Sequence, residues 1–265
     1  MSEYKVLGHD VNEVQKKIFG IFKEFDRVCK KHGISYTLEG GTLLGAVLHH
    51  GFIPWDDDMD VIMLREEYEK FCNVAPTELQ PPFVFENQHS RPEYPFLFGK
   101  CYDTSTVFLE EATQHLDIQH GVFLDIFIED TIYPRWKWLH CHLVGAINVV
   151  RGIKLGVEHF SLRHILYAPL FLLSQQKLAA LAEKVMRCFE GHKTGYVYPL
   201  SESVSSKPPL PMRMFTQFVP AKFEDYDVQI PQCHMWYLHK HYETPMELPP
   251  VEKRHPGHGV VEVKL

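Results

Sequence analysis

The chain contains two adjoining stretches from which its architecture can be inferred, Leu38-Glu-Gly-Gly-Thr-Leu-Leu-Gly-Ala-Val47 and Gly51-Phe-Ile-Pro-Trp-Asp-Asp-Asp-Met-Asp60. Residues 34–38 alternate apolar and polar side chains, which predicts a strand, and residues 42–50 have the pattern of a short helix. The apolar residues 61–64 that follow the aspartates predict a second, buried strand. Strand, glycine turn and helix are therefore expected in that order, with carboxylates at the beginning of the next strand.

The aspartates of this region have the spacing of a metal site. Asp58 and Asp60 are two residues apart, so on an extended chain their side chains share one face and can chelate a hard cation such as Mg²⁺ or Mn²⁺. Asp125 lies inside a predicted apolar strand, residues 121–128. Burying a carboxylate there is costly unless it is paired or binds a metal. We therefore predict that Asp58, Asp60 and Asp125 form a catalytic metal site.

Other interpretations of the same residues have to be weighed. An isolated run of aspartates is usually a solvated loop, and this is our expectation for Asp56 and Asp57. A calcium-binding EF-hand loop is excluded because its sixth position, which needs glycine, is Val61. Gly40 and Gly41, with the amide of Thr42, are predicted to contact phosphate, although a Gly-Gly pair is more often only a turn.

The rest of the chain divides by its periodicity. Residues 11–29 predict an amphipathic helix, with an N-cap at Asp10 and a stop at Gly33. Short strands are predicted at 83–85, 95–102, 107–109 and 215–219, a loop at 201–211 and a helix at 234–242. Strand patterns disappear between residues 135 and 191. We therefore predict a core of residues 1–134, a helical lobe of residues 135–191, and a C-terminal segment, 192–265, that packs on the core.

Composition limits the class of protein. The 265 residues carry 27 Lys and Arg against 34 Asp and Glu, a net charge of −7, which gives no general attraction to nucleic acid. The six cysteines form no Cys-x-x-Cys pair, and the N-terminus has no pattern of a secretory signal. Seventeen histidines without recognisable ligand spacing do not predict zinc. A cytoplasmic protein is expected.

One segment reverses the sign of the whole chain. Residues 135–164 contain Arg135, Lys137, Arg151, Lys154 and Arg163 against Glu158 alone. Two tryptophans and an apolar run lie nearby, so the segment is predicted to rest on an anionic membrane face, as a peripheral contact, or to hold a phosphate-bearing glycan. The alternative is a helical lobe with a solvated basic face.

The two opening stretches, together with Arg65-Glu-Glu-Tyr-Glu-Lys-Phe71, closely resemble the LicD family, which includes fukutin and fukutin-related protein. Further similarity is found at Lys100, at the strand that contains Asp125, and at Leu248-Pro-Pro-Val-Glu-Lys-Arg254. The resemblance implies an α/β (α+β) nucleotidyltransferase fold of the DNA polymerase β type, with a mixed sheet. One departure is Leu48, where many members of the family have arginine.

The resemblance also implies an activity. Members of the family transfer phosphocholine from CDP-choline, or ribitol phosphate from CDP-ribitol, to a glycan such as lipopolysaccharide or teichoic acid, with a divalent metal. On that basis Asp125 is expected to ligate the metal or to accept the acceptor's proton, a choice that sequence spacing does not make. Lys100 is expected to neutralise phosphate and Trp55 to contact the base or the choline, although strand-end and packing roles are equally open for them. Two alternatives remain. One is a noncatalytic protein that retains the fold, which Leu48 suggests, and the other is a nucleotidyltransferase that activates sugars or antibiotics.

Overall fold

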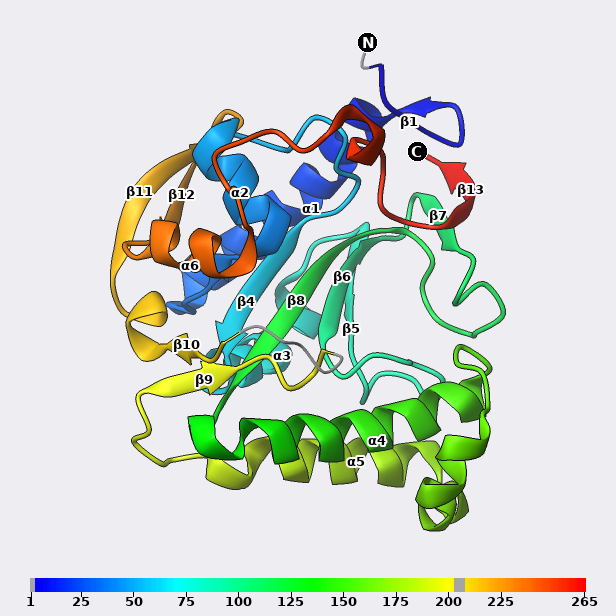
Figure 1. Cartoon of the computed structure of the whole chain (residues 1–265). Coiled ribbons are helices and arrows are strands. Elements are labelled where there is room, and N and C mark those ends of the chain that lie inside the picture. The colour runs from blue at the N-terminus through cyan, green and yellow to red at the C-terminus, as the bar shows by residue number, and fades with distance from the viewer. Residues whose placement is uncertain (1–2, 203–207) are drawn as a thin grey trace.

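A computed structural model describes residues 3–202 and 208–265, and Figure 1 shows its arrangement. Seven strands form a mixed sheet: β3 (Thr37–Leu38), β4 (Asp60–Leu64), β5 (Phe83–Glu86), β6 (Gly99–Asp103), β8 (Val122–Thr131), β9 (Tyr196–Tyr198) and β10 (Leu210–Pro211). The central strand β8 runs parallel to β4 and antiparallel to β6 and β9. The predicted α/β class with a mixed sheet is confirmed.

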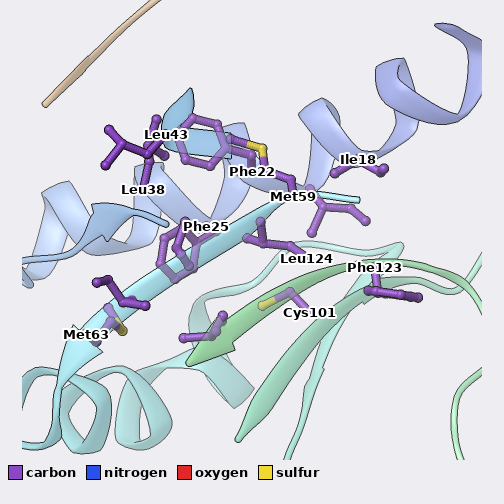
Figure 2. Packing of buried hydrophobic residues seen from close by; sticks show 14 of the residues in the cluster. Ile18, Phe22, Phe25, Leu38, Leu43, Met59, Met63, Cys101, Phe123 and Leu124 are labelled. Atoms are coloured by element: carbon purple, nitrogen blue, oxygen red, sulfur yellow. The ribbon is translucent and has the colours of Figure 1, made fainter. Parts of the chain in front are cut away.

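Three helices accompany this sheet, α1 (Val11–His32), α2 (Gly40–Leu48) and α3 (Arg65–Glu78). The Asp10 side chain accepts a hydrogen bond from the amide of Asn12, and Gly33 ends α1 in the left-handed conformation, as predicted. Figure 2 shows the apolar face of α1, with Phe22 and Phe25, above the strands of the sheet. Burial of this face fixes α1 against the sheet and therefore fixes the strand ends near it.

A buried ion pair joins α3 to the end of β8. The guanidinium of Arg65 donates from Nε to Oδ1 of Asp130 at 2.8 Å and from Nη2 to Oδ2 at 2.6 Å. Both side chains are buried, so neither charge has an alternative partner in solvent. The pair therefore holds the parallel β4–β8 ladder at the end opposite to Asp60.

The helices of residues 135–191 gather beyond the carboxyl end of β8 (Figure 1). They are η1 (Pro134–Trp136), α4 (Lys137–Leu155), η2 (Leu162–Leu172), α5 (Gln175–Met186) and η3 (Arg187–Phe189). Their buried side chains form an apolar cluster of their own around Ile147 and Leu178. The division of the chain into three parts stays a prediction.

Arg151 does not contribute to a basic surface, contrary to our expectation. It is 1% exposed, and its guanidinium donates to the carbonyl oxygens of Tyr94 and Pro95 at 2.9 and 3.1 Å. Burial lowers its pKa to about 10. The strand predicted to start at Pro95 begins only at Gly99, after the two residues whose carbonyls accept from Arg151.

The C-terminal segment returns across the core. A hairpin of β11 (Phe218–Phe223) and β12 (Tyr226–Pro231) is followed by α6 (His234–His241), η5 (Val251–Lys253) and β13 (Val260–Lys264). β13 pairs with β7 (Val107–Glu110), and β1 (Lys5–Val6) pairs with β2 (His9–Asp10). The strand predicted at 215–219 starts later, because residues 212–215 form the 3-10 turn η4 (Met212–Phe215). The loop predicted at 201–211 lies partly outside the described residues, at 203–207.

Candidate active site

The glycine turn brings backbone close to a carboxylate. Gly40 has a φ of +51°, which L side chains rarely adopt, and a Cβ atom added at Gly41 would lie 2.8 Å from Oδ2 of Asp56. The amide of Gly40 donates to the hydroxyl of Tyr237 at 3.1 Å. The amides of Gly41 and Thr42 precede the first intrahelical hydrogen bond of α2, so they lie at its positive end. This is the geometry from which backbone donors can contact an anion.

The Thr42 side chain has a separate, structural task. Its hydroxyl accepts a hydrogen bond from the amide of Asp60 at 2.8 Å, and the amide of Glu39 donates to the carbonyl of Asp60 at 3.1 Å. These two bonds tie the first turn of α2 to the first residue of β4. The glycine turn and the first carboxylate of the strand are thereby held in register.

Sheet register places Asp60 and Asp125 side by side. They are direct partners on the parallel strands β4 and β8, which are about 4.8 Å apart in any sheet. Burial raises the pKa of Asp60 well above its usual range, and the charges of Asp58 and Asp125 raise it further. Burial also raises the pKa of Asp58, while the nearby imidazole of His258 opposes the shift. The predicted carboxylates are therefore brought together, in a setting that disfavours their negative charge.

Asp56 belongs to this cluster, which corrects the expectation of a solvated loop residue. Burial, the charge of Asp58 and then that of Asp57 raise the pKa of Asp56 to about 8, and Asp56 and Asp58 share a hydrogen bond between their carboxyl groups. Gln15 of α1 donates to the Asp56 carbonyl at 2.8 Å and to the Ile53 carbonyl at 3.1 Å. The helix α1 therefore anchors the loop of residues 56–59, which we call the aspartate loop.

Asp57 is a buried structural residue, and the expectation of solvent exposure is wrong for it too. It is 2% exposed. Its carboxylate accepts hydrogen bonds from the amide of Gly257 at 3.0 Å, the amide of His258 at 3.4 Å and Nδ1 of His258 at 3.1 Å. Asp57 thus fastens the C-terminal segment to the aspartate loop, 200 residues away in sequence.

Lys100 lies opposite Asp125 on the antiparallel strand β6. It is 3% exposed, and its ammonium is 3.0 Å from Oδ1 of Asp125 and 3.4 Å from the ring centroid of Phe123. Burial raises the pKa of Asp125, and the ammonium of Lys100 opposes this, which leaves a value of about 6. In this structure Lys100 therefore neutralises Asp125, and its predicted contact with phosphate stays a prediction.

His258 is a further cation beside the carboxylates. Burial by itself lowers the pKa of its imidazole, but the hydrogen bond to Asp57 and the charge of Asp58 outweigh burial and raise the pKa to about 9. The ring also makes an edge contact with Phe123, with the centroids 5.5 Å apart. Sequence patterns gave no reason to single out His258 among 17 histidines.

A cavity of about 660 Å³ opens above the cluster. The residues that line it include Gly41, Asp56, Asp58 and Asp60 from the core and residues 241–245, 247–250 and Lys253 from the C-terminal segment. Such a volume lies in the range of small-molecule sites. The segment that covers the cavity contains the family-like stretch 248–254, which was the sequence signal for its involvement.

Aromatic side chains form part of this cavity. Trp55 lines it, but the guanidinium of Arg254 already lies 5.6 Å from the centroid of its ring, so the predicted contact with donor stays a prediction. Tyr242, which sequence reasoning missed, also lines it, and burial together with the charges of Asp56 and Asp60 raises its pKa. Leu48 is another lining residue, so the departure from arginine falls at the cavity wall.

The fit of a metal can be judged from these groups. Within residues 3–202 and 208–265, no three His, Cys, Asp or Glu side chains are already arranged as the ligands of one ion. The carboxylates do share one end of the sheet and raise one another's pKa, and carboxylate oxygen is the donor that Mg²⁺ and Mn²⁺ prefer. Asp58 and Asp60 therefore fit a hard divalent cation by chemistry, whereas Asp125 is already paired with Lys100.

Strand, glycine turn, helix and paired carboxylates define a nucleotidyltransferase domain. Residues 33–139 match the family described as LicD/FKTN/FKRP, nucleotidyltransferase domain. The match covers 107 of the 265 residues and supports the resemblance of this part of the chain to the LicD family.

Among characterised relatives, the chain is similar to the lipopolysaccharide cholinephosphotransferase LicD of Haemophilus influenzae. The alignment of the two spans 275 positions at 28% identity, and it covers 94% of this chain and 96% of the relative. Uncharacterised proteins of Rickettsia typhi and Rickettsia prowazekii are 26% and 24% identical over 64% and 57% of this chain, and the matches cover 55% and 58% of their own lengths.

Proposed function

We propose that this chain transfers phosphocholine, or a related alcohol phosphate, from a CDP-activated donor to a hydroxyl of a cell-surface glycan and releases CMP. The observation that carries the proposal is the convergence of Asp56, Asp58 and Asp60 with the first turn of α2 on one cavity of about 660 Å³. The similarity to a lipopolysaccharide cholinephosphotransferase along nearly the whole chain supports the choice of phosphocholine and glycan.

The donor diphosphate is assigned to the space between the glycine turn and the carboxylates. The amides of Gly41 and Thr42 would donate to its oxygens from the positive end of α2. Asp58 and Asp60 would hold Mg²⁺ or Mn²⁺, and the bound cation would supply charge neutralisation of the diphosphate and of the leaving CMP. Without such a cation, ionised Asp56, Asp58 and Asp60 would repel a diphosphate.

The proposed transfer is a single displacement at phosphorus. The acceptor hydroxyl oxygen attacks the phosphorus that bears choline, the bond from that phosphorus to the bridging oxygen breaks, and CMP leaves with the electron pair. We assign the proton of the hydroxyl to Asp125, because its pKa of about 6 suits a general base near neutral pH and because Lys100 already holds it in place.

The test is CMP release from a panel of CDP-alcohols, each with Mg²⁺ or Mn²⁺ and a glycan acceptor, measured by mass spectrometry. We expect CMP with CDP-choline and its loss in Asp58→Asn. The matched control is Asp26→Asn, because Asp26 is also a buried carboxylate but lies in α1 and accepts hydrogen bonds from Tyr36 and Tyr226. If neither metal supported release with any donor, the chain would be a binding protein that retains the fold.

We place the transfer in the cytoplasm, where CDP-activated donors are made, with no nucleic acid as a partner. In support, the net charge of −7 offers no general attraction to polyanions, so a phosphorylated ligand must be met locally. Among the described residues no single helix is long and apolar enough to cross a membrane, and one bent pair, Leu162–Leu172 with Gln175–Phe189, passes that test only jointly. Fractionation of cells that express the tagged protein tests this assignment.

A further inference from the structure

The helical lobe exposes apolar side chains on the outside of the molecule. Of the fifteen large hydrophobic residues that are exposed in the described part of the chain, nine lie between residues 136 and 172. The most exposed of them form a set that we call the lobe surface: Trp138, Phe160, Leu162, Ile165, Leu166 and Leu172. Three of these leucines are 81%, 82% and 87% exposed. Monomeric proteins rarely leave such a concentration uncovered without a partner.

The helix α4 is apolar on both sides, which isolated exposed residues would not explain. Its inner face is buried in the lobe through Val144, Ile147 and Val150. Outside that face lie Trp138, which is exposed, Leu139 and Leu143, which are exposed and four residues apart, and Val149, which is half-buried. No charged residue occurs from 138 to 150. A helix that is hydrophobic all round is normally covered on all sides.

The charge of the lobe indicates what covers it. Residues 135–191 carry eight Lys and Arg against three Asp and Glu, whereas the rest of the chain has 19 against 31. Arg135, Arg163, Lys177 and Lys184 are exposed among these basic residues, and Lys154 is exposed but donates to the carbonyls of Phe171 and Leu173. Tryptophan beside exposed basic residues is typical of the water–membrane interface. A second copy of the chain fits poorly, because a two-fold contact would place this basic surface against itself.

We infer that the lobe surface binds the anionic face of a lipid bilayer. The apolar side chains enter the boundary between headgroups and acyl chains, and the basic residues contact the lipid phosphates. The lobe follows the carboxyl end of β8, and Asp125 lies six residues before that end, about 20 Å away along the strand. Figure 1 shows the lobe helices beyond the carboxyl end of β8 and α2 towards the other end of the sheet. Because α2 lines the carboxylate cavity through Gly41 and Leu48, the lobe holds the protein at the membrane without covering the cavity.

The inference is tested without substrate, so its failure is separate from failure of the transferase proposal. Purified protein is sedimented with vesicles of phosphatidylcholine alone and of phosphatidylcholine mixed with phosphatidylglycerol. We expect binding to the mixed vesicles that weakens with salt. The triple variant Leu162→Ser, Leu166→Ser and Leu172→Ser should lower the partition coefficient by at least about tenfold, since each leucine loses apolar burial.

Charge-reversal variants in the same vesicle-binding assay test the role of the basic residues. Arg135→Glu with Arg163→Glu should weaken binding by about fivefold for each positive charge removed. Lys5→Glu and Leu7→Ser, at exposed positions of the N-terminal segment, are the matched controls and should bind as the parent does. Circular dichroism checks that every variant is folded.

Three results would overturn the inference. They are equal binding to neutral and anionic vesicles, unchanged binding by both lobe variants, and a concentration-dependent dimer in light scattering that the leucine variant abolishes. The last would assign the surface to self-association.

Discussion

Replacing Asp60 by asparagine is expected to stabilise the metal-free protein while it abolishes transfer. Asp60 and Asp125 are partners on adjacent parallel strands, and the charges of Asp58 and Asp125 both raise the pKa of Asp60. At the spacing of neighbouring strands, about 5 Å, two unit negative charges repel by about 3 kcal/mol at an effective dielectric constant of about 20, and the ammonium of Lys100 offsets part of this repulsion. Proton uptake and solvent relieve part of this, so we expect asparagine to add about 1–2 kcal/mol to the free energy of unfolding near pH 8.

The assay is urea unfolding in the presence of a chelator and again with excess Mg²⁺. An ion present at about 100 times its dissociation constant adds about 2.7 kcal/mol to the stability of a protein that binds it, so the parent should become the more stable of the two when Mg²⁺ is present. Asp26→Asn is the control. Its carboxylate accepts hydrogen bonds from tyrosine hydroxyls at 2.7 and 2.6 Å, and its loss should cost about 1–3 kcal/mol under both conditions.

The reasoning would be refuted if Asp60→Asn destabilised the chelated protein as Asp26→Asn does. Such a result would mean that the Asp60 carboxylate stabilises the fold rather than being strained for binding. If Asp60 had a purely structural role, adding Mg²⁺ would not reverse the order of stability of the parent and Asp60→Asn.

Three other perturbations have defined outcomes. The folded-state pKa of Asp56, about 8, lies above its unfolded value, so the folded state binds the extra proton. Asp56 alone should therefore cost the chelated protein up to about 1.4 kcal/mol of stability per pH unit between about pH 4 and pH 8, and the raised pKa values of Asp58 and Asp60 add to this loss. A flat or rising melting temperature over that range would contradict this. Arg65→Met should lower the free energy of unfolding in urea by about 3–5 kcal/mol, because it leaves Asp130 buried and unpaired. The double variant Arg65→Met with Asp130→Leu should recover most of that stability. A double variant as unstable as the single one would argue against the ion pair as the cause. Gly41→Ala should displace the carboxylate of Asp56 and raise KM for the donor by about tenfold or more. The control is Gly20→Ala, where an added Cβ meets only Phe83 at 4.0 Å; it should raise the free energy of unfolding by about 0.5–1 kcal/mol and leave KM unchanged.

Local patterns predicted the elements that build the site. The glycine turn, the helix after it and the apolar strand from Asp60 are all visible as short-range periodicity, and the capped helix α1 matches its pattern from Asp10 to Gly33. The same patterns identified Asp125 because a carboxylate inside an apolar strand is chemically conspicuous. What the sequence supplied was therefore the set of elements and the carboxylates that need partners.

Long-range partners were beyond the reach of those patterns. Asp57 looked like a loop residue because its partners, Gly257 and His258, are 200 and 201 residues away. Arg151 looked like a surface charge because the carbonyls that bury it precede it by 56 and 57 residues. Whether a charged side chain faces solvent or a distant backbone is decided by tertiary packing, which neither composition nor periodicity encodes.

The Lys100 and Asp125 pair shows a third kind of limit. Sequence reasoning assigned Lys100 to phosphate and Asp125 to metal binding or proton transfer, but strand register sets them opposite each other, with ammonium and carboxylate 3.0 Å apart. Register depends on which strands become neighbours, and the strand order of a mixed sheet is not a local property. The pairing is the reason for assigning proton transfer, rather than metal binding, to Asp125.

The most direct test of the transferase proposal follows which phosphorus of CDP-choline reaches the acceptor. The protein is incubated with CDP-choline, Mg²⁺ and a glycan acceptor, and the mass of the acceptor product is measured. The proposal predicts an acceptor heavier by phosphocholine together with free CMP, both absent in Asp58→Asn. An acceptor that gains CMP while phosphocholine is released would contradict it and identify the chain as a nucleotidyltransferase in activity as well as in fold.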